Sequence, residues 1–125
     1  MIKFQTPTGT DFNFSFDFKS EKITITSGSG FSFNYHINAL KDLYDWLKIE
    51  KKGEWILLGT KGEEETASQD TVEAWARDEK NPNGGFYGLT PGRKGRFASY
   101  IPSILEFLKF VEIEHNKKNN RVRSL

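Results

Sequence analysis

Strict alternation of apolar and polar residues marks the first part of the chain. The run DFNFSFDFK (residues 11–19) places four Phe side chains on one side and polar side chains on the other, which is the period of a half-buried strand. The runs KITIT (22–26) and FSFNY (31–35) repeat the alternation after the turn-like segments KSEK and SGSG. The pattern therefore predicts three consecutive antiparallel strands that form a meander.

From Ile37 onward the apolar period changes to three and four residues. This spacing predicts an amphipathic helix over Asn38–Lys48 that lies across the Phe face of the sheet. The apolar run WILL (55–58), between two glycines, predicts a fourth and more buried strand. Together these elements make an N-terminal half with four strands and one helix.

The C-terminal half is predicted to be helical and to end in a β-hairpin. TVEAWAR (71–77) opens a helix, with Asp70 or Thr71 as its N-cap. The clearest helical stripe follows, and its apolar positions are Phe97, Tyr100, Ile101, Ile104, Leu105 and Leu108. FVEIEHNKKNNRVRSL (110–125) alternates, turns over NKKNN and alternates again, so it predicts a hairpin with a basic tip. The fold class is therefore α+β.

The length of 125 residues predicts a single compact domain. The polar, acidic segment KGEEETASQD (61–70) is the candidate internal boundary. It separates residues 1–60, a β-meander plus helix, from residues 71–125.

Charge is unevenly distributed along a chain whose formal net charge is only +1. Residues 81–125 hold eight Lys or Arg against three Asp or Glu, whereas residues 1–80 hold ten against fourteen. Such asymmetry is typical of a protein with an anionic partner, and it is equally consistent with two patches that complement one another within a monomer or across a dimer.

Several function classes find no support in the residues. There is no cysteine, so disulfides, thiolate metal sites and a cysteine nucleophile are excluded. The two histidines, His36 and His115, fit no metal-binding spacing, and no catalytic motif is present. No apolar segment is long enough to span a membrane. We therefore expect a cytoplasmic, non-enzymatic protein without a cofactor or metal.

The glycine-rich segment NPNGGFYGLTPGRKGRFASY (81–100) is the most unusual stretch. Its cations Arg93, Lys94 and Arg96 lie just before a predicted helix, where free backbone N–H groups favour an anion. Two other interpretations stay open. In one, the glycines serve turns and the cations are solvated. In the other, the segment forms a small-ligand pocket with Trp75, Arg77, Phe86 and Tyr87.

Two resemblances add to this reading. The order of helix, loop, helix and basic hairpin over residues 71–125, and above all SYIPSILEFLKFVEIEHNKKNNRVRSL, resembles a winged helix-turn-helix. That resemblance implies a recognition helix in a groove and a hairpin wing on the phosphate backbone. The predicted recognition helix, however, presents Ser99, Ser103, Glu106 and Lys109 and contains a proline, which favours phosphate contacts over base reading.

Residues 75–120 are also similar to small uncharacterised bacterial proteins, which implies no activity.

The leading hypothesis is a small binding protein with DNA or another polyanion as its partner. The residues expected to contact the anion are Arg93, Lys94, Arg96, Lys117, Lys118, Arg121 and Arg123. The alternative is a protein–protein interaction module or self-associating dimer with no catalytic activity, in which the acidic and basic parts meet across subunits.

Overall fold

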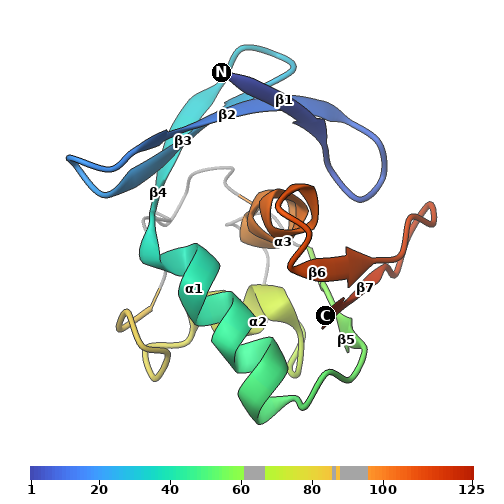
Figure 1. Cartoon of the computed structure of the whole chain (residues 1–125). Helices are drawn as coiled ribbons and strands as arrows, with labels where there is room; N and C mark the ends of the chain where they lie inside the picture. The colour runs from blue at the N-terminus through green and yellow to red at the C-terminus, as the bar shows by residue number, and fades with distance from the viewer. Residues whose placement is uncertain (61–66, 86, 88–95) are drawn as a thin grey trace.

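An α+β architecture is seen in the computed structural model, which describes residues 1–60, 67–85, 87 and 96–125 (Figure 1). The N-terminal sheet is antiparallel with the order β1-β2-β3-β4. Its strands are β1 (Ile2–Gln5), β2 (Asp11–Asp17), β3 (Lys22–Ser27) and β4 (Ser32–His36). The predicted meander is confirmed, but its fourth strand is Ile2–Gln5 and not the WILL run.

Alternation along β2 buries one face of this sheet as predicted. Phe12 and Phe14 are buried and face the molecule's core, while Asn13 and Ser15 lie on the opposite face. The fourth Phe of the run, Phe18, is not buried, because it lies beyond the end of β2 in the β2–β3 turn. Its side chain is 75% exposed. The period-two pattern therefore extends past the hydrogen-bonded strand.

The helix that packs its rings on the Phe face is α3 (Phe97–Phe107), not the helix expected over residues 38–48. Tyr100 of α3 contacts Phe12 edge to face at 5.1 Å between ring centroids, and Phe107 contacts Phe14 at 5.6 Å. Figure 1 shows the sheet arched over α3. Helix α1 (Asn38–Asp45) packs on α3 in turn, and it continues as one π-helical turn, η1 (Trp46–Glu50).

A second, three-stranded sheet has the order β5-β7-β6 and is antiparallel throughout. Its strands are β5 (Ile56–Leu57), β6 (Val111–Ile113) and β7 (Arg121–Ser124). The C-terminal hairpin is thus confirmed. The WILL run does form a strand, but it pairs with β7 through Ile56 and Val122. Helix α2 (Val72–Arg77) begins after Thr71, whose hydroxyl accepts from the Ala74 N–H, as expected for an N-cap.

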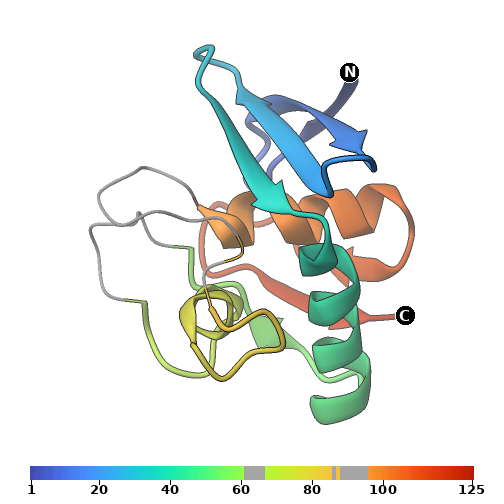
Figure 2. The same cartoon turned by 90° about the vertical axis from the view of Figure 1, so that its left-hand side faces the viewer.

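The winged-helix interpretation is not confirmed, because the helix expected to read a groove is enclosed. Seven of the eleven residues of α3 are buried. Figure 2 shows α3 running below the N-terminal sheet, with α2 on its other side. One continuous core joins both sheets and all three α-helices, from Phe14 and Ile25 through Leu43 and Ile101 to Val122. A helix packed in this way cannot enter a DNA groove in the structure described.

Candidate binding surfaces

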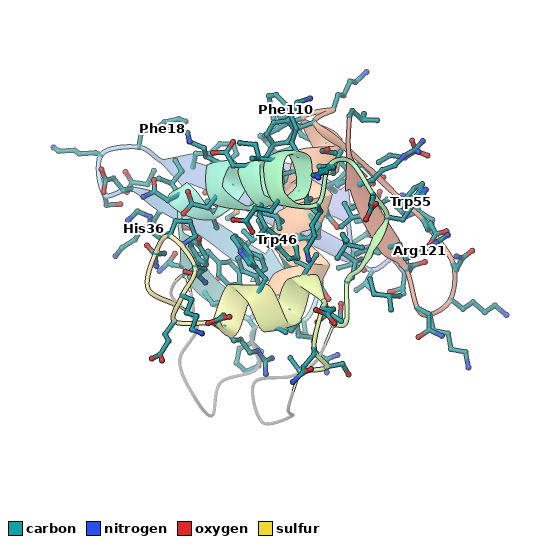
Figure 3. The ribbon with its side chains drawn as sticks, turned by 90° about the horizontal axis from the view of Figure 1, so that it is seen from below. Phe18, His36, Trp46, Trp55, Phe110 and Arg121 are labelled. Carbon is teal, nitrogen blue, oxygen red and sulfur yellow. The ribbon has the colours of Figure 1, made fainter. Side chains whose placement is uncertain are left out.

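Exposed or half-buried apolar side chains, six of them aromatic, lie around the end of α3 and the β2–β3 turn. We define the aromatic band by its members Phe4, Phe16, Phe18, Tyr44, Phe107, Leu108, Phe110 and Leu125. Each is partly or largely exposed, from the half-buried Phe4, Phe16 and Tyr44 to Phe18, which is 75% exposed. Figure 3 shows Phe18 and Phe110 on the same edge, next to α1.

Ring contacts, most of them edge to face, connect the N-terminal part of the band. Phe16 contacts both Phe14 and Phe18, at 5.6 and 5.7 Å between centroids. Phe107, at the end of α3, contacts Phe14 and also Phe4, at 5.6 and 5.4 Å. Phe16 and Phe107 therefore rest on the buried ring of Phe14, whereas Phe18 rests on the partly buried Phe16 and is largely exposed.

The end of α3 positions the other part of the band. Lys109 adopts a left-handed conformation (φ 68°), and the Phe110 N–H donates to the Leu105 carbonyl at 3.0 Å, as in a Schellman motif. This turn brings Phe110 against the ring of Tyr44 at 5.5 Å. The Tyr44 hydroxyl then donates to the Leu125 carbonyl at 3.2 Å. Residues from α1, the α3 terminus and the end of β7 thus meet at one place.

Sequence reasoning missed this band. The helical stripe correctly predicted that Phe97, Ile101, Ile104 and Leu105 of α3 are buried, but it also included Leu108, which is exposed. The prediction that Ser103 faces outward was wrong, because α3 is covered on that side too and Ser103 is buried. The available signal was that Phe107 and Phe110 are large apolar residues off that stripe. Large apolar side chains that lie outside the core-facing stripe of a helix face the surface, where they can form an apolar patch.

The predicted cations of the hairpin do not form a free basic surface. Arg121 donates from Nε and Nη2 to the two oxygens of Glu114, at 2.9 and 2.7 Å. Because Arg121 donates to it, Glu114 has a pKa below its usual value. Arg123 pairs with Glu112 at 3.0 Å. Both guanidinium groups also lie over the ring of Trp55, with Cζ at 5.4 and 4.6 Å from its centroid.

Lys117 and Lys118, by contrast, are exposed, and no carboxylate of the described residues pairs with them. The tip that carries them has a defined conformation. The side chain of Asn120 accepts from the Asn116 N–H at 2.6 Å and donates to the Asn116 carbonyl at 3.0 Å. Because both ends of the loop share these bonds, the two lysines are presented on a closed turn.

Two other predicted sites fall partly outside the described residues. Arg93 and Lys94 of the anion site lie outside them, whereas Arg96 is exposed and immediately precedes α3. Phe86 of the predicted pocket also lies outside them.

The described residues of the predicted pocket pack against one another or against the core. Trp75 stacks on Tyr87 at 5.5 Å and on Trp46 at 5.2 Å, and Tyr87 is fully buried. Arg77 pairs with the buried Glu73 at 3.4 Å. In the part of the chain that is described, these residues therefore contribute to the core.

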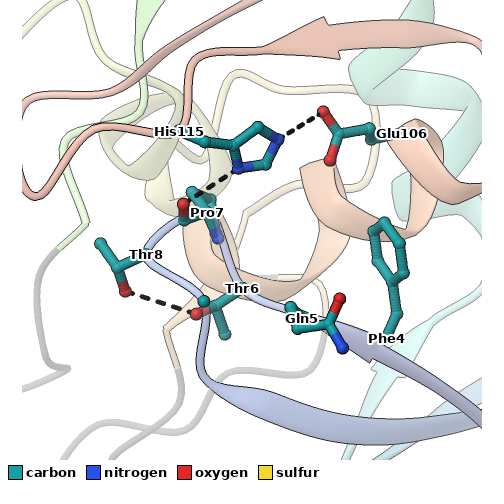
Figure 4. Close-up of a pocket in the computed structure, with 8 residues that line it drawn as sticks. Phe4, Gln5, Thr6, Pro7, Thr8, Glu106 and His115 are labelled. Carbon is teal, nitrogen blue, oxygen red and sulfur yellow. Dashed lines mark hydrogen bonds and ion pairs between the residues drawn. The ribbon is translucent and has the colours of Figure 1, made fainter.

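A cavity of about 340 Å³ opens where the β1–β2 loop meets α3 and the hairpin. Figure 4 shows His115 between the Pro7 carbonyl and the Glu106 carboxylate, at 3.0 and 2.9 Å. Phe4 and the segment from Gln5 to Gly9 complete its wall. No motif had predicted this site, because its members come from three distant segments.

Some classes of site find no counterpart among the described residues. No group of three or more His, Asp or Glu residues is placed to hold a metal ion in that part of the chain. Nor does any helix within it have the length and apolar character needed to cross a membrane.

Comparison with known proteins identifies the family of the chain but supplies no activity. Curated proteins and solved structures show no match to it. The match to a family covers residues 2–125, which includes both sheets and the whole glycine-rich segment. The chain therefore belongs to DUF6855, a family of unknown function.

Proposed function

We propose that the protein is a non-enzymatic interaction module that associates with a second copy of itself through the aromatic band. The observation that carries this proposal is the exposure of connected aromatic rings at the end of α3. Contiguous apolar patches on a protein surface mark interaction sites. Fully covering an exposed Phe side chain contributes roughly 1.5–3 kcal/mol, and a two-fold interface would cover each ring twice.

Two features favour a second copy as the occupant. The net charge of +1 means that two copies repel one another only weakly. The charges bordering the band also have both signs, since Asp17 and Lys19 flank Phe18 while Lys109 precedes Phe110. In a two-fold arrangement, the Phe18 end of one copy would face the Phe110 end of the other, with Asp17 near Lys109.

Replacing Phe18 with serine is expected to weaken this association strongly. Each interface residue occurs twice in a two-fold dimer, so the loss is about 3 kcal/mol or more, or at least roughly 100-fold in Kd. Sedimentation velocity over a series of micromolar concentrations measures this directly. Phe18→Ser and Phe110→Ser should sediment as monomers at concentrations where the wild type sediments as a dimer.

Phe31→Ser is the matched control. Phe31 is 70% exposed, like Phe18, but lies in the β3–β4 turn and outside the band. The control should dimerise as the wild type does. A wild type that stays monomeric throughout, or a Phe31 variant that loses association to the same degree, would refute self-association through the band.

A second candidate is contact with a polyanion through the hairpin tip. Its specific support is that Lys117 and Lys118 are exposed, pair with no carboxylate of the described residues, and lie on a turn held by Asn116 and Asn120. The element order α1, β5, α2, α3, β6, β7 also supports keeping the winged-helix hypothesis, now over residues 38–125, with the hairpin as its wing. Because α3 is covered, this proposal concerns phosphates only and predicts no base reading.

Neutralising the tip is expected to abolish most of this binding. Labelled double-stranded DNA would be titrated at about 50 and 200 mM salt with the wild type and with Lys117→Gln/Lys118→Gln. Wild-type affinity should fall with salt, and the variant should bind more weakly with a shallower salt dependence. Lys19→Gln/Lys22→Gln removes the same charge from the N-terminal sheet and should bind normally. Equal losses in both variants would indicate a net-charge effect and contradict a site at the tip.

A further inference from the structure

His115 joins three segments that are far apart in the sequence. It lies at the start of the hairpin tip, its Nδ1 is 3.0 Å from the Pro7 carbonyl oxygen in the β1–β2 loop, and its Nε2 is 2.9 Å from Glu106 Oε2 on α3. We propose that His115 is a proton-operated latch that holds the hairpin tip to the β1–β2 loop and closes that side of the cavity.

The geometry specifies the closed form of the latch. A carbonyl oxygen and a carboxylate oxygen can only accept hydrogen bonds, so both ring nitrogens must carry a proton for both bonds to form. Only the imidazolium meets that condition. A neutral His115 can donate to one partner, and the other then faces a ring nitrogen lone pair across about the same distance. Loss of one proton therefore breaks one of the two links.

Glu106 is itself fixed by a further bond. Its Oε2 also accepts from the Ile113 N–H at 3.3 Å, which ties the carboxylate to the first strand of the hairpin. Its side chain is only 20% exposed, so neutralisation by His115 matters more than it would on an open surface.

No other charged group competes for His115 among the described neighbours. Gln5 at the end of β1 and residues Thr6 to Gly9 of the β1–β2 loop line the cavity, and none of these residues titrates. Glu114, next to His115 in the hairpin, is engaged by Arg121. Lys117 lies two residues further along and pairs with no described carboxylate. Glu106 is therefore the counter-ion that sets the charge state of the latch.

The pH range of the latch follows from these contacts. Partial burial alone would lower the pKa of His115, but the bonds to Pro7 and Glu106 outweigh it and raise the pKa above 6.5. A group whose pKa is higher in the folded state stabilises that state fully below the unfolded value. The contribution is lost as the pH rises through the folded value. Both links are thus made in mildly acidic solution, and one is lost as the pH rises through the folded-state pKa of His115, which lies above the ordinary value.

An NMR titration of the whole protein tests the latch. The ring nitrogens of His115 should titrate with a pKa above 6.5, and the backbone amides of residues 8–10 and 113–117 should shift with that same midpoint. Glu106→Gln removes the counter-ion but keeps the side-chain shape, so it should lower the His115 pKa. In that variant the shifts of the β1–β2 loop should follow the lowered midpoint of His115.

His36 provides the internal comparison. Its Nδ1 accepts from the Asn38 N–H at 3.1 Å, and the ring has no contact with the β1–β2 loop among its described bonds. His36→Gln should leave every signal of the latch unchanged. A His115 pKa at or below 6.5, or amides of residues 8–10 that do not follow its titration, would overturn the proposal. Neither outcome depends on the oligomeric state or on DNA binding.

Discussion

Replacing Gly59 with alanine is expected to destabilise the fold by about 2 to 5 kcal/mol. Gly59 has a φ of +62°, and a Cβ added there would lie 2.4 Å from the Cβ of Thr71. The left-handed conformation costs an L residue roughly 1–2 kcal/mol, and overpacking a close contact costs about 1–3 kcal/mol more. Thr71 cannot withdraw without releasing the N-cap of α2, because its hydroxyl accepts from Ala74. Urea unfolding monitored by tryptophan fluorescence would measure the loss.

Gly84→Ala separates the two causes. Gly84 has a similar φ of +79°, but an added Cβ would have no neighbour within 4 Å. This variant should lose only the conformational part, about 1–2 kcal/mol. If both variants lost the same free energy of unfolding, the close approach of Gly59 to Thr71 would not contribute to the loss.

Replacing Asn81 with alanine should destabilise the protein by about 3 kcal/mol, because four backbone groups lose a hydrogen bond to its side chain. The buried amide donates to the carbonyls of Trp75 and Ala76, at 3.0 and 3.1 Å. Its oxygen accepts from the N–H groups of Asn83 and Gly85, at 3.0 and 2.9 Å. The end of α2 and the start of the glycine-rich segment are therefore both held by one side chain. Thermal or urea unfolding reports the loss.

Asn83→Ala is the control for this site. Asn83 is exposed, and its side chain makes one long bond, 3.4 Å, to the Gly85 carbonyl. We expect its loss to change stability by less than about 0.5 kcal/mol. A comparable loss in the two variants would contradict the central role of Asn81. Asn81→Asp should also be destabilising, because it would place a carboxylate oxygen against two carbonyls.

Local patterns were sufficient for most elements of the fold. The period-two runs predicted β2 to β4, the apolar stripe predicted the buried face of α3, and Thr71 was an expected N-cap of α2. Strand β1 was missed, because four residues are too few for a period to be recognised. Its existence depends on pairing, for example of Phe4 with Phe12.

Long-range arrangement was the part that the sequence could not supply. The run WILL was correctly predicted as a strand, but a continuous apolar run does not specify its partner. Both amphipathic helices could have covered the Phe face, and only packing selects α3. The charge pattern likewise predicted that Arg121 and Arg123 are available to an anion. Their pairing with Glu114 and Glu112 depends on the register of the hairpin, which the pattern does not specify.

The most direct test of the central claim is an isotope-filtered NOE experiment on a mixture of labelled and unlabelled protein. This experiment detects only contacts between different copies. Association through the aromatic band predicts intermolecular contacts from the Phe18 ring of one copy to Leu108 or Phe110 of the other. Intermolecular contacts that arise only from Phe31 or from the hairpin tip, or none at concentrations where sedimentation would detect a dimer, would contradict it.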